Sequence, residues 1–173
     1  PRKTPARRMT PNPLGLRSDF PATLHGQIEA EAIVTLTRSP GREGFVAAWK
    51  AIAYRFLTCA ESDQRLHESM KSAGQAPPPY ERYSQDSALF EFFTNAVAVM
   101  DSLFYAAYCL AHARAPSEFP LGTPADRKRI NTTNTATRLS EKFPTDRLSE
   151  QLGAILKADR FTEIKDVRNI LAH

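Results

Sequence analysis

Two long segments with the periodicity of an α-helix, separated by three consecutive prolines, constrain the fold more than any other feature. The first begins at Arg42, places apolar residues at three- and four-residue steps, and fades by Gly74. The second runs from a capping site at Ser84 to Asp86 to about Arg114, and its apolar arc is wide. Pro77-Pro78-Pro79 cannot continue a helix, so a loop is expected there. The second helix should therefore lie at the centre of a bundle, with neighbours on most sides.

The side chains of the two long helices divide into a predicted core and a narrow polar stripe. In the first helix, Phe45, Trp49 and Phe56 recur at helical spacing, and we interpret them as core residues rather than as a platform for stacking bases. In the second helix, the positions that remain polar or small recur at nearly heptad steps: Glu91, Asn95, Ala98, Ser102, Tyr105, Cys109 and His112.

Three shorter helices are predicted after the second long one. A polar helix spans 124–142, with its proline at an early position, and another runs from Arg147 to about Lys157. The last begins at Thr162 or slightly earlier and buries Phe161, Ile164, Val167 and Leu171. The predicted fold class is an all-α bundle of about five helices, two long and three shorter.

The segment before the first long helix is ambiguous. Residues 27–32 favour a helix, whereas residues 33–37 favour a strand, so a short helix and an arm packed on a neighbour both stay open. We predict that residues 1–41 form a basic, proline-rich N-terminal extension or arm. Residues 42–173 then form the helical-bundle domain.

The positive charge belongs mainly to the N-terminal extension. The chain carries a net charge of +4, and residues 1–17 hold five basic residues without an acid, which leaves about −1 for the remainder. Such a tail is suited to non-specific contact with phosphates, and it is equally suited to being a solvated leader.

Composition favours a cytoplasmic protein. No apolar segment follows the basic N-terminus, so a secretory signal is not expected, and no apolar run approaches the ~20 residues that a membrane span needs. The two cysteines, Cys59 and Cys109, form no CxxC pair and lie in separate helical segments. We expect a reducing environment and no membrane association.

Several classes of site find no support in the sequence. The seven glycines are scattered and build no phosphate loop, and no serine lies in a GxSxG turn. The four histidines lack HExxH or CxxC partners, so neither a metal site nor a cofactor is predicted.

The candidate chemistry lies at the C-terminal end, where Arg168 and Asn169 precede His173. Arg168 and His173 are five positions apart, roughly 140° around a helix axis, and both side chains can reach one cleft. An arginine keeps its charge, while an imidazole gains or loses a proton near neutral pH. The pair is suited to chemistry on a phosphodiester.

Arg168-Asn169-Ile170-Leu171-Ala172-His173 resembles the R-x4-6-H motif of the HEPN superfamily, in which the residue after the arginine is commonly Asn, Asp or His. HEPN domains are small α-helical bundles with the motif on or after the last core helix. The resemblance is tight over residues 161–173, looser over residues 49–173, and does not reach the N-terminal third.

The resemblance implies a metal-independent RNA endonuclease, acting as a toxin or a defence effector. His173 would be the general base on a ribose 2′-OH or its acid partner, and Arg168 would stabilise charge on the scissile phosphate. Asn169 would orient the histidine or a phosphate oxygen, and the products would carry 2′,3′-cyclic phosphate and 5′-OH ends. The implied partners are RNA, a second copy of the chain forming a composite site, and an antitoxin or nucleotidyltransferase.

Other residues enter the prediction only through their position. Asn95, Asp101 and Ser102 on the second long helix are candidates to line the cleft, and Arg127, Lys128 and Arg129 are candidate RNA contacts.

Two alternatives stay open. A helix C-terminus stabilises basic residues, and a salt bridge from Arg168 to Glu163 or Asp166 would give the arginine a structural role. The domain is alternatively a non-catalytic HEPN-like module for dimerisation or partner binding.

Overall fold

The computed structural model describes residues 16–172, which form seven α-helices and no strand. The predicted all-α class is confirmed, but the described part of the chain contains more helices than the five expected. The helices are α1 (Ala22–Thr35), α2 (Arg42–Ala73), α3 (Pro79–Arg114), α4 (Pro124–Lys128), α5 (Thr132–Lys142), α6 (Arg147–Lys157) and α7 (Asp159–Leu171).

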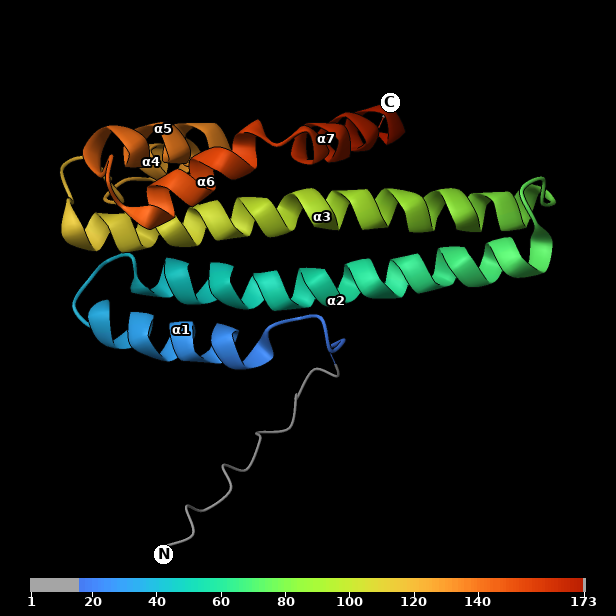
Figure 1. The fold of residues 1–173 in the computed structure, drawn as a ribbon, viewed down its shortest axis with the longest axis horizontal. Helices are drawn as coiled ribbons and strands as arrows, with labels where there is room; N and C mark the ends of the chain where they lie inside the picture. Colours follow the sequence, from blue (N-terminus) through green and yellow to red (C-terminus); the bar gives the residue numbers. More distant parts are fainter. Residues whose placement is uncertain (1–15, 173) are drawn as a thin grey trace, which may run out of the picture.

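The two long helices, α2 and α3, form an antiparallel hairpin along the whole length of the molecule (Figure 1). The bounds of α2 match the prediction, but the capping site at Ser84 to Asp86 is wrong because α3 already begins at Pro79. Proline is tolerated in the first helical position, where its missing N–H would have no partner in any case. The loop is therefore shorter than expected, and it turns at Gly74, whose φ of 72° suits glycine.

The polar and small stripe of α3 faces α2. A Cβ atom built on Gly44 would lie 3.1 Å from Cε1 of Tyr105 and 3.3 Å from Sγ of Cys109, so the two helices approach closely here. Further along, Oγ of Ser62 donates a hydrogen bond to the Glu91 carboxylate across the same interface, at 3.4 Å. Small side chains on this stripe let the two backbones pack tightly, while part of the apolar arc is covered by other helices.

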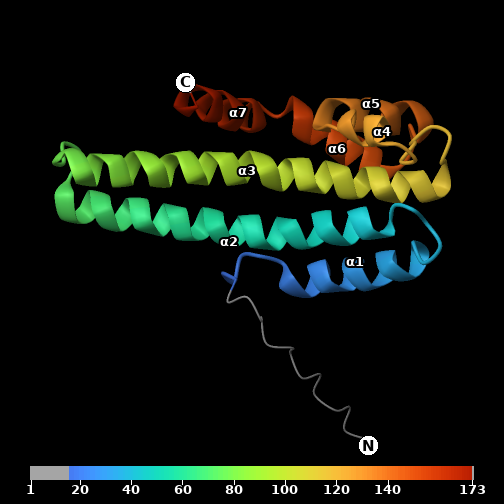
Figure 2. The ribbon, with the colours of Figure 1, turned by 180° about the vertical axis from the view of Figure 1, so that it is seen from behind.

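The ambiguous segment before α2 is a helix, α1, which packs against α2 (Figures 1 and 2). Nε1 of Trp49 donates to the carbonyl oxygen of His25 at 3.0 Å, and Nε2 of His25 lies 2.9 Å from the carbonyl oxygen of Trp49, to which it donates. The two rings stack with centroids 4.9 Å apart. Leu36 is fully buried in the same core as Phe45. Trp49 and Phe45 are thus core residues, as predicted.

The single helix predicted over 124–142 is wrong, because the chain forms two helices there. Asn131 has an extended backbone, and its side-chain oxygen accepts a hydrogen bond from the backbone N–H of Asn134 at 2.9 Å, which starts α5 anew. Thr123 and Asp126 form a reciprocal capping box at the start of the short α4. The helix predicted over 147–157 is confirmed as α6, capped by Asp146.

Helix α7 lies along the middle of α3, and its C-terminal end is directed away from α4, α5 and α6 (Figures 1 and 2). It begins at Asp159, slightly before the predicted Thr162. Phe161 is buried as expected, whereas Ile164, Val167 and Leu171 are only half-buried. Phe161 is therefore the main anchor of α7.

The largest buried cluster lies where α1 and the α4–α6 group meet the α2–α3 hairpin (Figure 1). Phe45, Phe104 and Phe119 are fully buried in it. The opposite end of the hairpin has fewer neighbours, and Tyr80 and Tyr83 are 79% and 70% exposed there. The bundle therefore has a well-packed end and a thinly covered end.

Among residues 16–172, α3 is long and apolar enough to cross a membrane by length and composition, which corrects the expectation that no run reaches that length. The buried core helix of a soluble protein meets the same criterion. Ten residues of α3 are buried within the bundle, among them Phe104, Ala107 and Cys109.

Candidate functional site

Arg168 lies near the end of α7 and is half-buried. Its Nε atom is covered by protein and has no hydrogen-bond partner among the described residues. Asn169 and Ile170 are exposed, and Ile170 retains 75% of its accessible surface. His173 lies outside the described residues, so the motif is placed up to the residue before it.

The structural role considered for Arg168, a salt bridge within its own helix, is not found in residues 16–172. The four ion pairs of this range join Arg17 to Asp19, Arg65 to Glu91, Arg114 to Asp146 and Lys142 to Glu118. Neither Glu163 nor Asp166 takes part. Because Arg168 as a whole is only half-buried and its charge is not paired with a carboxylate in this range, its guanidinium is a candidate for binding an anion.

Asp101 of α3 is the candidate cleft residue that the fold brings close to Arg168. Its side chain keeps contact with solvent, and the surrounding helices still desolvate the carboxyl enough to raise its pKa above the ordinary value. The positive charges of Arg168, Arg55 and Lys165 oppose this shift and lower the pKa of Asp101. Cations of α2 and α7 thus act on the same carboxylate of α3, in an electrostatic cluster without direct ion pairs among the described residues.

Lys165 shares a face of α7 with Arg168 and with the buried Phe161. The spacing 161, 165 and 168 puts the three side chains on one helical stripe. Nζ of Lys165 lies 5.5 Å from the centroid of the Phe161 ring, in cation–π range. Because Phe161 anchors α7, Lys165 and Arg168 are directed to the side of α7 that packs on α3.

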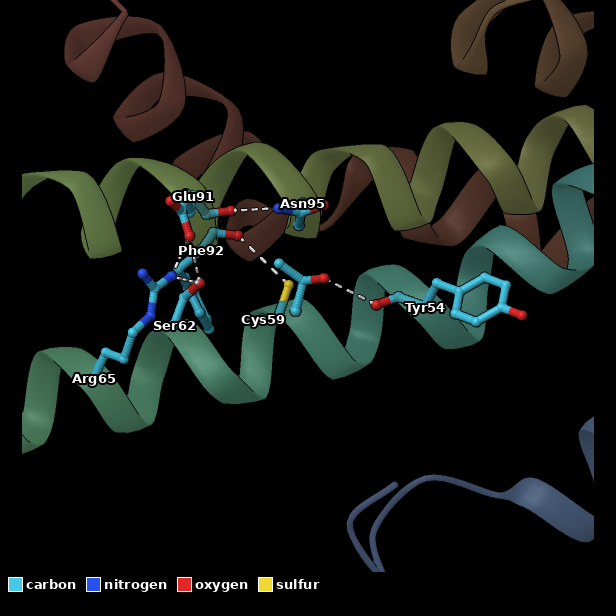
Figure 3. Close-up of polar contacts among 8 residues, drawn as sticks. Tyr54, Cys59, Ser62, Arg65, Glu91, Phe92 and Asn95 are labelled. Atoms are coloured by element: carbon cyan, nitrogen blue, oxygen red, sulfur yellow. Dashed lines mark hydrogen bonds and ion pairs between the residues drawn. The ribbon is translucent and has the colours of Figure 1, made fainter. Parts of the chain in front are cut away.

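The other two cleft candidates on α3 are engaged with their own helix. Nδ2 of Asn95 donates to the carbonyl oxygen of Glu91 at 2.9 Å, and Oγ of the buried Ser102 donates to the carbonyl oxygen of Ala98 at 2.8 Å. Figure 3 shows Asn95 next to a polar cluster between α2 and α3. Among the described residues, neither Asn95 nor Ser102 forms a hydrogen bond with Arg168 or Asp101, because both side chains bond to the backbone of α3.

The cluster in Figure 3 joins the two long helices. Arg65 pairs with the carboxylate of Glu91 and donates to Oγ of Ser62 at 3.1 Å, and Ser62 is fully buried. Sγ of Cys59 donates to the carbonyl oxygen of Phe92 at 3.5 Å, and burial raises the pKa of this thiol to about 11. These groups satisfy one another, so their role is to hold α2 in register with α3.

The candidate RNA contacts Arg127, Lys128 and Arg129 lie on or just after α4 and are exposed. Figures 1 and 2 place α4 towards the well-packed end of the molecule, away from the C-terminal end of α7. The charge of Arg127 acts on Tyr105 and Cys109 rather than on Asp101. The fold does not bring this basic run into the Arg168 cluster.

Two residues of the cluster, Arg55 and Lys165, were not singled out from the sequence. Arg55 is a half-buried cation within the apolar pattern of α2, and a charge at such a position is a signal that a partner lies opposite. Lys165 was detectable from its spacing with Phe161 and Arg168. Neither signal names the element that supplies the partner, because that depends on how α7 packs on α3.

No group of three or more side chains suited to a metal ion occurs in residues 16–172. Comparison with protein-family models, with curated proteins and with solved structures gives no match. The functional argument therefore depends on the chemistry of the cluster and of the C-terminal motif.

Proposed function

We propose that the protein is a metal-independent RNA endonuclease of the HEPN type, with Arg168 and His173 as its catalytic residues. The observation that carries the proposal is the state of Arg168: it is half-buried, its Nε lacks a partner within the described residues, and it precedes His173 by five positions. The HEPN-like arrangement is likewise a proposal, supported by an all-α bundle in which α7, the last helix of the described residues, carries Arg168 and Asn169.

In this mechanism the 2′-oxygen of a ribose attacks the adjacent phosphorus. A bond forms between the 2′-oxygen and phosphorus, and the bond from phosphorus to the 5′-oxygen of the next nucleotide breaks. One histidine accepts the 2′-OH proton, and a protonated histidine donates a proton to the departing 5′-oxygen. The products are a 2′,3′-cyclic phosphate and a 5′-OH, and no water or metal ion is consumed.

Arg168 acts on the phosphate. Its guanidinium donates charge-assisted hydrogen bonds to the non-bridging oxygens, whose negative charge grows in the transition state. Asn169 is exposed beside it and would orient the histidine or a phosphate oxygen. Two copies of the chain, with their motifs facing one another, supply the base and the acid of one composite site.

The test is cleavage of an end-labelled structured RNA by the full chain in EDTA, with His173→Ala and Arg168→Ala beside wild type. Wild type is expected to cleave, and both variants to lose at least a hundredfold in rate, the range for losing an acid–base group or an oxyanion-type donor. Arg160→Ala is the matched control, since Arg160 is an exposed arginine on α7 whose charge does not act on Asp101. Equal cleavage by wild type and both variants would refute the proposal.

A non-catalytic module for dimerisation or partner binding is the second candidate. It is favoured by the exposed apolar side chains of Ile170, within the motif, and of Tyr80 and Tyr83 at the thinly covered end. This function predicts a stable oligomer in sedimentation experiments without RNA cleavage. Cleavage that depends on Arg168 and His173 would exclude it as the sole function.

The biological role and the partners are proposed on the same basis. We expect a cytoplasmic toxin or defence effector that is restrained by an antitoxin or a nucleotidyltransferase. Growth arrest on expression, relieved by His173→Ala, would support this role, and normal growth with active enzyme would contradict it.

A further inference from the structure

We propose that Arg55 of α2 and Lys165 of α7 join Arg168 in a three-cation surface that binds successive phosphates of an RNA backbone, with Asp101 as its counterion in the free protein. This inference rests on the proposed RNA substrate and extends the site beyond the C-terminal motif. It assigns Arg55 and Lys165 to binding rather than to the chemical step.

The first support is the convergence of three helices. Helix α3 packs against both α2 and α7, and the half-buried Arg55, Lys165 and Arg168 all act on one carboxylate, that of Asp101. These four groups together carry a net charge of about +2 at neutral pH, and Asp166, between Lys165 and Arg168 in the sequence, is exposed. A local excess of this kind, on a folded body near neutrality, is an electrostatic feature suited to a polyanion.

The second support is the lack of closed ion pairs in the cluster. None of the four ion pairs in residues 16–172 involves Asp101, Arg55, Lys165 or Arg168, although other arginines of the bundle form short ones. Nη1 of Arg114, for example, lies 2.7 Å from Oδ2 of Asp146. The cations of the cluster are held near Asp101 without being neutralised by direct contact, and they keep N–H donors for phosphate oxygens.

The third support is that the two cations of α7 are held in place by the packing of their helix. The ring of the buried Phe161 lies 5.5 Å from Nζ of Lys165, and the same residue anchors α7 on α3. Lys165 and Arg168 are three positions apart and project from one face of the helix. Half-buried side chains lose less conformational freedom when a ligand binds, which favours a preorganised binding surface.

The experiment measures binding separately from cleavage. A fluorescent single-stranded RNA with 2′-O-methyl groups cannot form the cyclic phosphate, so anisotropy reports affinity alone, and the salt concentration is varied. Arg55→Gln and Lys165→Gln should each weaken binding and lower the slope of log K against log salt by about 0.7, the value for one phosphate contact in single strands. Asp101→Asn should strengthen binding about two- to fivefold, because it removes the competing counterion.

Matched variants control for folding and for non-specific charge. Arg55→Lys keeps the charge and should retain the wild-type salt slope. A slope that falls in Arg55→Gln but not in Arg55→Lys would therefore be due to the lost charge rather than to altered packing. Lys50→Gln and Arg160→Gln remove exposed cations from α2 and α7 whose charges do not act on Asp101, and they should leave the slope unchanged.

The outcomes separate this inference from the nuclease proposal. Slopes lowered by Arg55→Gln and Lys165→Gln but not by the controls support the three-cation surface, even if wild type cleaves no RNA. Slopes equal to wild type in both variants overturn it, even if cleavage still requires Arg168 and His173. Equal losses in all variants, controls included, also overturn it, because binding is then a diffuse effect of net charge.

Discussion

Replacing Phe161 by alanine should detach α7 while leaving the rest of the bundle folded. Phe161 is 7% exposed and is the buried residue of α7 among those described, whereas Ile164, Val167 and Leu171 are half-buried. A buried Phe→Ala change costs about 3–5 kcal/mol, and we expect the lower end because α7 lies at the surface and can relax. The cost falls on α7, since α2 and α3 hold each other through a separate, larger interface.

The loss is measured by hydrogen exchange. About 3 kcal/mol corresponds to roughly 100- to 200-fold faster exchange of the α7 amides, at tenfold for each 1.4 kcal/mol. Amides of α2 and α3 near the Phe45–Phe104 core should exchange at wild-type rates. Ile170→Ala is the matched control, because Ile170 is 75% exposed on the same helix and its removal should change exchange little.

Two results would refute this reasoning. Unchanged α7 exchange in Phe161→Ala would mean that the half-buried residues, not Phe161, hold the helix. Equal acceleration across α2, α3 and α7 would mean that α7 is part of one cooperative unit. If α7 does detach, RNA cleavage should fall as well, since Arg168 is then no longer held beside Asp101.

Two further predictions concern groups outside the site. Asp146→Ala should cost about 1–2 kcal/mol, from the loss of the α6 cap and of the ion pair with Arg114, and should lower the melting temperature by about 2–8 °C in a thermal melt. The hydrogen bond from Arg114, and then the one from the Leu148 N–H, lower the pKa of Asp146 in the folded state. The stability that ionised Asp146 contributes is therefore present above the ordinary pKa of 3.8 and is lost as the pH falls through the lower folded pKa. An acid titration in which the stabilities of wild type and variant differ equally at pH 7 and at pH 2 would contradict this. Burial raises the pKa of Cys59 to about 11 and that of Cys109 to about 12. At pH 8 both thiols should therefore react with maleimide at least tenfold more slowly in the native protein than in denaturant, and Cys109 should react more slowly than Cys59. Labelling of the native protein as fast as in denaturant would contradict this, because it would show that the thiols are accessible thiolates.

Periodicity and proline positions predicted much of the fold, and local capping chemistry accounts for the errors. The bounds of α2 and α6 followed from apolar spacing and breakers. The start of α3 was missed because Pro79 marks the first turn of a helix as readily as its end. The break between α4 and α5 was missed because Asn131 lies in a polar run, where the side chain that caps a new helix resembles any other polar residue.

The packing face of α3 was harder to predict from its composition. The wide apolar arc suggested that α3 contacts neighbours on most sides, but it did not indicate which face meets α2. Contacts at Glu91, Tyr105 and Cys109 place α2 against the small and polar stripe, where close approach of two helices is easiest. The spacing of residues in the sequence shows which side chains share a face of a helix. The shape of the partner helix decides which of these faces the partner covers.

The candidate site was predicted only in part for the same reason. Arg168 and Asn169 were found as a local motif, and the structure places Asp101 beside Arg168, while Asn95 and Ser102 bond to their own helix and Arg127–Arg129 lie elsewhere. Arg55 lies far from the motif in the sequence. Only the packing of α2, α3 and α7 unites them.

The most direct test of the central claim is the requirement for the ribose 2′-OH during cleavage in EDTA. The substrate is an RNA mapped for its cleavage site, compared with the same strand carrying one 2′-deoxy nucleotide immediately 5′ to the scissile phosphate. The account predicts that wild type cleaves the RNA to 2′,3′-cyclic phosphate and 5′-OH ends and leaves that position of the deoxy strand intact. Cleavage of both strands at the same position, or 5′-phosphate ends, would contradict it, because the 2′-oxygen would then not be the nucleophile.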